Sequence, residues 1–137
     1  MEKPWILLVA DSNPHVRSFL KRELSAFGYQ VHIAASVKEI FAGLKSEPSP
    51  DLLILDINMP VKIGLEVLAR LRKLIPRPPV IIYTDLVEYQ QHEQVRWVSA
   101  FVEKNGSPIP LKQAIEDVLQ RNAANVMNPS KPLEIWK

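Results

Sequence analysis

The sequence predicts a doubly wound α/β domain, in which helices cover both faces of a parallel sheet. Five short apolar runs recur along the chain, and several are continuous rather than alternating, which is typical of parallel strands buried on both faces. Between them lie segments whose apolar residues recur every three or four positions, the pattern of amphipathic helices. Because strand and helix alternate, we expect parallel pairing with right-handed crossovers.

The first half of the chain contains three predicted strands, at residues 5–10, 29–34 and 52–55. Asn13-Pro14 predicts the start of the first helix, since Asn is a good N-cap and Pro suits the first helical position. Gly28 suits the left-handed residue that ends this helix. Pro48 and Pro50 separate the second helix from the third strand. The apolar stripes of these two helices are Val16, Phe19, Leu20, Leu24 and Phe27, and Val37, Ile40, Phe41 and Leu44.

The second half of the chain contains the strands at residues 80–83 and 100–102. Pro76, Pro78 and Pro79 end the third helix, and Pro108 and Pro110 precede the fifth. Residues 87–98 are predicted as the fourth helix, although EYQQHEQ in its middle is polar. The stripes of the third and fifth helices are Val67, Leu68, Leu71 and Leu74, and Leu111, Ile115, Val118 and Leu119.

Five strand–helix units match the flavodoxin-like sheet, with strand order 2-1-3-4-5 and five helices. A chain of 137 residues, 47% of them apolar and 23% charged, suits one globular domain. We assign residues 1–124 to this domain and residues 125–137 to a C-terminal tail. There is no cysteine and no apolar run of about 20 residues that would cross a membrane. With a net charge of only +2, these features favour a cytoplasmic protein without direct contacts to nucleic acid or membrane.

Four polar residues directly follow or end strands of the predicted sheet. They are Asp11, Asp56, Thr84 and Lys104, on the first, third, fourth and fifth strands. In this fold the carboxyl ends of the strands form the reactive edge. Two acids, a hydroxyl and an ammonium suggest phosphoryl chemistry, with Asp56 as a nucleophile and Asp11 as a ligand of Mg²⁺. Lys104 and Thr84 would then contact the phosphate oxygens.

Four segments resemble the receiver domains of two-component response regulators, in particular the chemotaxis regulators that consist of a receiver alone. The resemblance covers about residues 4–124, and its most specific part is the spacing of Asp56, Met59-Pro60 and Gly64. The segments are VADSNPHVR (9–17), DLLILDINMPVKIG (51–64), IIYTD (81–85) and AFVEKN (100–105).

The resemblance implies a phosphorelay receiver rather than an enzyme. A histidine kinase or a phosphotransfer protein would phosphorylate Asp56, with Mg²⁺ as cofactor. Thr84 and Lys104 would sense the phosphate, and Phe101 would be the switch aromatic. The metal ligands would be Asp11, Asp56 and the backbone carbonyl of Asn58. An output protein would bind the face made by the fourth helix, the fifth strand and the fifth helix, since little chain remains after the last helix.

The acid pair departs from the family's pattern. Ser12 stands where a second acid is usually a metal ligand, so Ser12 is at most a further, neutral ligand and Mg²⁺ binding should be weak. Asp85 follows Thr84 where the family prefers a small residue, which makes Asp85 a candidate modulator. Asn105 replaces the usual Pro after the Lys, and Ile63 replaces a frequent Asp.

These departures support an alternative, a pseudo-receiver that binds a partner without using phosphate. A flavin-binding protein is disfavoured because only four Gly occur and none lies in the turn at residues 10–13. The sequence also leaves a homodimer open.

Overall fold

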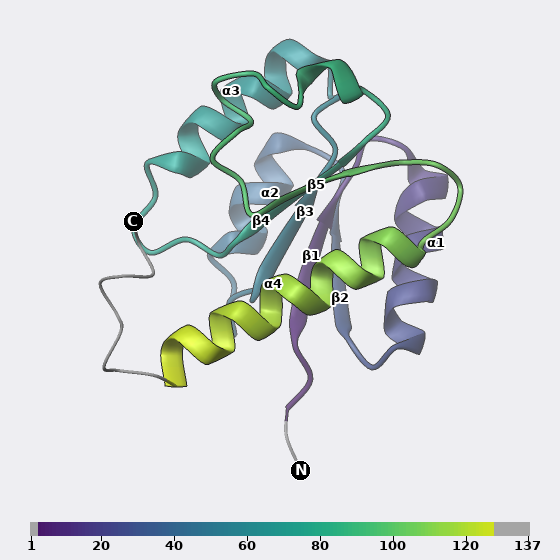
Figure 1. Cartoon of the computed structure of the whole chain (residues 1–137), viewed down its shortest axis with the longest axis vertical. Helices are drawn as coiled ribbons and strands as arrows, with labels where there is room; N and C mark the ends of the chain where they lie inside the picture. Colours follow the sequence, from purple (N-terminus) through teal and green to yellow (C-terminus); the bar gives the residue numbers. More distant parts are fainter. Residues whose placement is uncertain (1–2, 128–137) are drawn as a thin grey trace.

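The computed structural model describes residues 3–127, and within this range it contains a five-stranded parallel sheet in the order β2-β1-β3-β4-β5 (Figure 1). The predicted fold class and strand order are thus confirmed. Every strand begins and ends within one residue of the predicted position. The strands are β1 (Ile6–Ala10), β2 (Gln30–Ala34), β3 (Leu52–Leu55), β4 (Val80–Thr84) and β5 (Ala100–Glu103).

The three central strands are buried along their whole length. Every residue of β1, β3 and β4 is buried, whereas only Val31 and Ala34 are buried in the edge strand β2. Successive side chains of a strand point to opposite faces. A strand with helices on both sides must therefore be apolar at every position, which explains the continuous apolar runs.

The helices divide between the two faces of the sheet (Figure 1). On one face, α1 (Pro14–Ala26) and α4 (Ile109–Met127) pack against Leu7, Val9 and Ile54. On the other, α2 (Val37–Leu44) and α3 (Val61–Arg72) pack against Leu8, Leu53 and Leu55. The buried helix residues come from the predicted stripes: Leu20, Leu24, Ile40, Val67, Leu68, Leu71, Leu111, Ile115, Val118 and Leu119.

The ends of α1 are formed by the residues that its sequence suggests. The side-chain oxygen of Asn13 accepts a hydrogen bond from the backbone N–H of His15, and Pro14 occupies the first turn. Gly28 has a φ of 94°, in the left-handed region that a residue with a Cβ rarely adopts. The loop from β1 into α1, which carries Asp11 and Ser12, is thereby anchored at its helical end.

The predicted helix at residues 87–98 is wrong. The structure has a short 3₁₀ helix, η1 (Val87–Tyr89), followed by turns up to β5. Val95 and Val98 have helical spacing, but the seven residues between Val87 and Val95, EYQQHEQ, contain no aliphatic side chain, so no continuous helical stripe forms. In addition, the ring Nδ1 of His92 accepts a hydrogen bond from the backbone N–H of Gln94, which competes with helical pairing. Four α-helices, rather than five, therefore lie within the described residues.

The last helix, α4, continues to Met127, three residues past the predicted end of the domain at residue 124. The remaining residues assigned to the tail, 128–137, lie outside the described part of the chain. None of the helices in the described part is long and apolar enough to cross a membrane.

Gly64, in the first turn of α3, lies against the loop that follows Asp56. A Cβ at this position would overlap the backbone carbonyl of Ile57 and lie 2.8 Å from the Ile57 Cα. Because the obstacle is backbone, it cannot move aside as the end of a side chain would. Gly64 thus allows α3 to begin close to the loop from Asp56 to Pro60, and its place in the sequence motif has a steric reason.

Gly64→Ala should therefore destabilise the domain, by about 1–3 kcal/mol or more, because the added methyl group overpacks a buried contact. Urea denaturation measures the change. Gly43→Ala is the matched control, since a Cβ on this α2 glycine would meet only the end of the Leu8 side chain. If Gly64→Ala is as stable as the wild type, the backbone at Ile57 can move away from α3 without a cost in stability.

Candidate functional site

The carboxyl edge of the sheet gathers four polar side chains from four strands. Asp11 follows β1, Asp56 follows β3, Thr84 ends β4 and Lys104 follows β5. The side chains of Asp11 and Asp56 are 4% and 8% exposed, and Thr84 is fully buried. Burying charged groups is costly unless they are paired, so their contacts determine what the site can do.

The ammonium group of Lys104 bridges the two carboxylates. Its Nζ lies 2.8 Å from Oδ2 of Asp11 and 2.7 Å from Oδ2 of Asp56. Burial lowers the pKa of Lys104, but the hydrogen bonds and charges of Asp11 and Asp56 outweigh that effect, so its pKa is raised above the ordinary lysine value. Lys104 is therefore protonated at neutral pH.

The other carboxylate oxygen of Asp56, Oδ1, accepts two hydrogen bonds. The hydroxyl of Thr84 donates one at 2.7 Å, and the backbone N–H of Asn58 donates the other at 3.0 Å. Both oxygens of Asp56 thus have partners, which compensates for the burial of this carboxylate. The same contacts fix the orientation of Asp56.

Asp11 is held from two sides. Its Oδ1 accepts a hydrogen bond from the backbone N–H of Asn13, and its backbone carbonyl accepts one from the guanidinium of Arg17 at 2.7 Å. Arg17 was not among the residues predicted from the sequence, although it ends the VADSNPHVR segment. Arg17 is a positioning residue, because it touches the backbone of Asp11 and not its carboxylate.

Tyr83 is a second neighbour that the sequence analysis missed. Burial raises the pKa of its hydroxyl, and the Nζ of Lys104 lies 5.8 Å from the ring centroid, within the range of a cation–π contact. Its position directly before Thr84 could have indicated from the sequence that Tyr83 lies near the site.

The residues that depart from the family pattern lie at the rim of the site. The hydroxyl of Ser12 donates a long hydrogen bond of 3.4 Å to the carbonyl of Asn58, and both residues are exposed. Asp85, directly after Thr84, is exposed as well. Ser12 thus lies beside the Asn58 carbonyl that was proposed as a metal ligand.

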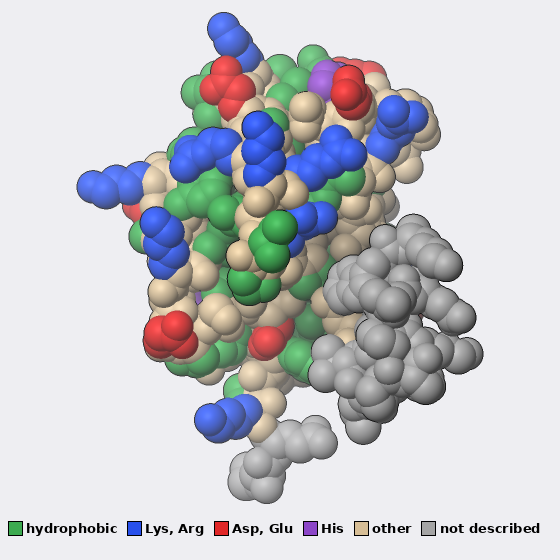
Figure 2. Space-filling model, turned by 90° about the vertical axis from the view of Figure 1, so that its left-hand side faces the viewer, with side chains coloured by type: hydrophobic (Ala, Val, Ile, Leu, Met, Phe, Trp, Pro, Cys, Tyr) green, Lys and Arg blue, Asp and Glu red, His purple; other side chains and the backbone are tan. Residues whose placement is uncertain are grey.

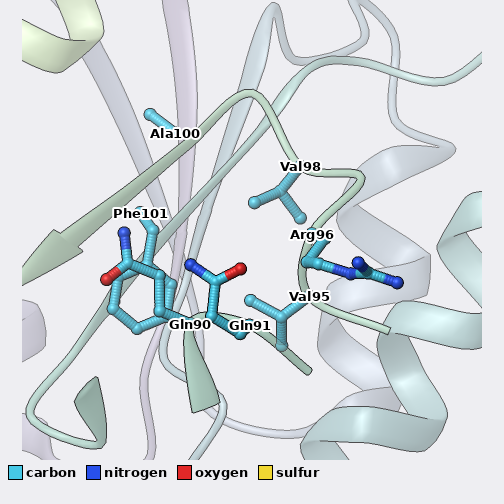
Figure 3. A pocket seen from close by; sticks show the side chains of 7 residues that line it. All are labelled: Gln90, Gln91, Val95, Arg96, Val98, Ala100 and Phe101. Atoms are coloured by element: carbon cyan, nitrogen blue, oxygen red, sulfur yellow. The ribbon is translucent and has the colours of Figure 1, made fainter. Parts of the chain in front are cut away.

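Phe101, the predicted switch aromatic, is half-buried in β5. It faces a cavity of about 340 Å³ between β5 and the segment that replaces the predicted fourth helix (Figure 3). The other lining residues are Gln90, Gln91, Val95, Arg96, Val98 and Ala100. This open space gives the ring of Phe101 room beside a segment held mainly by turns.

The residues at this edge fit Mg²⁺ by their chemistry. Mg²⁺ prefers oxygen ligands and often takes only one or two carboxylates from a protein, which Asp11, Asp56 and the Asn58 carbonyl can supply. Residues 3–127 contain no cluster of three or more acidic, His or Cys ligands. Both carboxylates already contact Lys104, so a metal ion would compete with an ammonium group for them.

A family model described as the response regulator receiver domain matches residues 7–116. The chain therefore belongs to the receiver domains of response regulators, the signal-receiving modules of two-component systems.

Several known proteins are similar to this chain. The transcriptional regulatory protein GlrR of Escherichia coli is 33% identical over 88% of the chain and 28% of GlrR. The response regulator MprA of Mycobacterium avium is 32% identical over 92% of the chain and 52% of MprA. The chain thus spans between about a quarter and a half of these relatives.

Solved structures give the same result. The response regulator TrrA of Thermotoga maritima, crystallised with Mg²⁺ and BeF, is 30% identical, with a TM-score of 0.76 over 83% of this chain and 98% of that one. A TrrA structure in complex with the histidine kinase ThkA is 31% identical, with a TM-score of 0.75 over 84% of this chain and 98% of that one.

Lys104→Met tests the bridge. Removing the ammonium leaves two buried carboxylates without their cation, so the free energy of unfolding should fall by about 3 kcal/mol in metal-free buffer. Millimolar Mg²⁺ should restore part of this loss, because the metal can take the place of the ammonium. Urea denaturation with and without Mg²⁺ measures both effects.

Lys112→Met is the matched control, since the ammonium of Lys112 contacts the partly exposed Glu23 at 3.5 Å and the ring of Phe27, and not the carboxylates at the strand ends. Equal stability of Lys104→Met and the wild type would contradict a structural role for the bridge. A loss that Mg²⁺ leaves unchanged would show that the two carboxylates do not bind the metal.

Proposed function

We propose that this chain is a cytoplasmic phosphorelay receiver whose Asp56 accepts a phosphoryl group from a histidine kinase or a phosphotransfer protein. The proposal rests mainly on the environment of Asp56. Its carboxylate lies at the end of the central strand β3, 8% exposed, and contacts Thr84, Lys104 and the N–H of Asn58. Membership in the receiver family and similarity to TrrA, which has been crystallised with a histidine kinase, support the proposal.

In the transfer, a carboxylate oxygen of Asp56 attacks the phosphorus of a phosphohistidine. The P–O bond forms as the P–N bond breaks, and the electron pair of that bond returns to the imidazole of the donor. Asp56 becomes an acyl phosphate, which spreads negative charge over the phosphoryl oxygens. Mg²⁺, held by Asp11, Asp56 and the Asn58 carbonyl, would neutralise part of that charge.

The neighbours of Asp56 would then read the new charge. Lys104 can turn its ammonium from the carboxylates to a phosphoryl oxygen, and the Thr84 hydroxyl can donate to another. Thr84 directly precedes the segment 85–99, and Lys104 follows Phe101 by three residues. This segment and Phe101 line the cavity described above, so they have free space beside them. A shift there would change the surface formed by this segment, β5 and α4, which we propose as the binding face for an output protein.

A second candidate is the pseudo-receiver, and one observation favours it. Lys104 already neutralises one of the two acids, and Ser12 contributes no charge, so the site attracts a divalent cation less than a site with three carboxylates would. In this case the domain would bind its partner in the conformation described above, whether or not a phosphodonor is present.

Treatment with Mg²⁺ and acetyl phosphate or beryllium fluoride separates the two candidates. A receiver should gain the mass of one phosphoryl group with acetyl phosphate, and its backbone amide NMR signals near residues 84–105 should shift with beryllium fluoride. Asp56→Asn should abolish both responses. If the wild type shows no response at millimolar Mg²⁺, the phosphorylation proposal fails and the pseudo-receiver remains.

Ser12→Asp should tighten Mg²⁺ binding. Two unit charges 4 Å apart attract by about 1 kcal/mol even in bulk water, so a carboxylate facing a divalent ion should gain about 2 kcal/mol, or roughly 30-fold in affinity. Titration with Mg²⁺, followed by NMR, measures the change. Ser49→Asp adds the same charge to an exposed loop before β3, at the other edge of the sheet, and should leave the affinity unchanged. Equal affinities for Ser12→Asp and the wild type would place the metal elsewhere.

A further inference from the structure

An apolar groove lies at the edge of the sheet opposite to Asp56. It has a volume of about 370 Å³ and is formed mainly by the segment between α3 and β4. Its lining residues are Leu74, Ile75, Pro76, Arg77, Pro78, Pro79, Val80, Trp97, Ser99 and Asn122. Figure 2 views the molecule from the side on which this segment lies, and shows exposed hydrophobic side chains flanked by Lys and Arg.

Ile75 is the clearest sign that the groove is built to be covered. It is 93% exposed, and it lies beside Leu74, Pro76 and Trp97 rather than alone among polar residues. Single exposed apolar residues are common on proteins, but a contiguous apolar hollow usually marks a binding surface. Burying a side chain of this size contributes about 1.5–3 kcal/mol.

The rim of the groove is positively charged. Arg77 donates a hydrogen bond of 2.7 Å to the carbonyl of Arg72 at the end of α3, and its guanidinium lies 4.9 Å from the ring of Trp97. These two contacts hold the cation beside the apolar surface. An occupant with large apolar side chains and an acidic group among them would match both features.

Trp97, which lines the groove, has a hydrogen-bond donor that is unpaired among the described residues. The indole N–H of Trp97 is buried and has no acceptor within the described part of the chain. A buried donor without a partner costs about 1–3 kcal/mol. The indole N–H therefore does not hold Trp97 in its present position.

We propose that the occupant is the segment 128–137 of this chain. Its sequence, NPSKPLEIWK, contains Leu133, Ile135 and Trp136, with the acid Glu134 among them. The apolar residues would cover Ile75 and Trp97, and Glu134 would face Arg77. Pro129 and Pro132 limit the freedom of the unbound segment, which lowers the entropic cost of docking it.

The position of α4 makes this contact possible. Asn122 of α4 already lines the groove, and the helix ends at Met127, five residues and roughly 7.5 Å further along. Trp136 is nine positions beyond Met127, and such a segment spans up to roughly 30 Å when extended. The chain can therefore turn back from the end of α4 and reach the groove.

Docking of this segment would stabilise the turns that carry Trp97. These turns connect η1 to β5, so the tail would restrain a part of the domain that otherwise lacks regular structure. The groove lies at the edge of the sheet away from Asp56, and the docking requires neither phosphate nor metal. Its test is therefore independent of the test of phosphorylation.

The chain has no cysteine, so Lys137→Cys provides a single site for a nitroxide spin label. In the full-length, ¹⁵N-labelled protein, the label should remove most of the NMR signal intensity at the amide of Ile75 and the indole N–H of Trp97. The amides of Asn58 and Asp85, at the opposite edge, should keep theirs. Unlabelled Lys137→Cys protein gives the reference intensities.

Two variants test the specificity of the contact. Ile75→Ser, combined with Lys137→Cys, should restore the lost intensity. Because Ile75 is almost fully exposed, this change leaves the core intact. Ile109→Ser is the matched control. Ile109 is 58% exposed and lies at the start of α4, near the carboxyl ends of the strands, whereas the groove lies at their amino ends. Glu134→Lys should weaken the contact by repulsion from Arg77.

Three results would overturn the proposal. The first is full intensity at Ile75 and Trp97 in the labelled protein, and the second is a loss that Ile75→Ser does not change. The third comes from mixing spin-labelled ¹⁴N protein with unlabelled ¹⁵N protein. A loss of equal size in that mixture would assign the groove to the tail of a second copy.

Discussion

The ion pairs of the Lys104 ammonium with Asp11 and Asp56 hold together the polar site at the carboxyl ends of the strands. Asp11 and Asp56 lie on neighbouring strands, and both are buried, so their charges would repel one another in a medium that screens poorly. Lys104 contacts both, but it follows β5, which pairs only with β4. The arrangement of the site thus requires the complete strand order, because the cation comes from two strands beyond Asp56.

The sequence predicted the sheet well because burial on both faces leaves a strong pattern. β1, β3 and β4 can contain little besides apolar residues, and the residues at the ends of α1 have local conformational reasons to be where they are. The failure at residues 87–98 has the opposite cause. This segment is held by backbone hydrogen bonds of successive turns, by the packing of Val95 and Trp97 and by the side chain of His92, none of which produces a periodic pattern.

The predicted fold was enough to place the polar residues at one edge of the sheet. It was not enough to predict which of them touch. That one lysine would touch both acids depends on side-chain reach between residues 93 positions apart, which no spacing rule describes. The same holds for Arg17, whose partner is a backbone carbonyl, and for Gly64, whose obstacle is the backbone of Ile57. Sequence motifs indicated where these residues stand, and their steric and electrostatic reasons are visible only in the folded structure.

The strand order also has a consequence for the protein during its synthesis. Both acids belong to the part of the chain that is made first, whereas β4 and β5 follow after residue 79. Strands β2, β1 and β3 are neighbours in the sheet, so they can pair before the rest of the domain exists. Such a nascent sheet would present two carboxylates and no ammonium. The charge of these two acids is therefore compensated only when β5 adds Lys104.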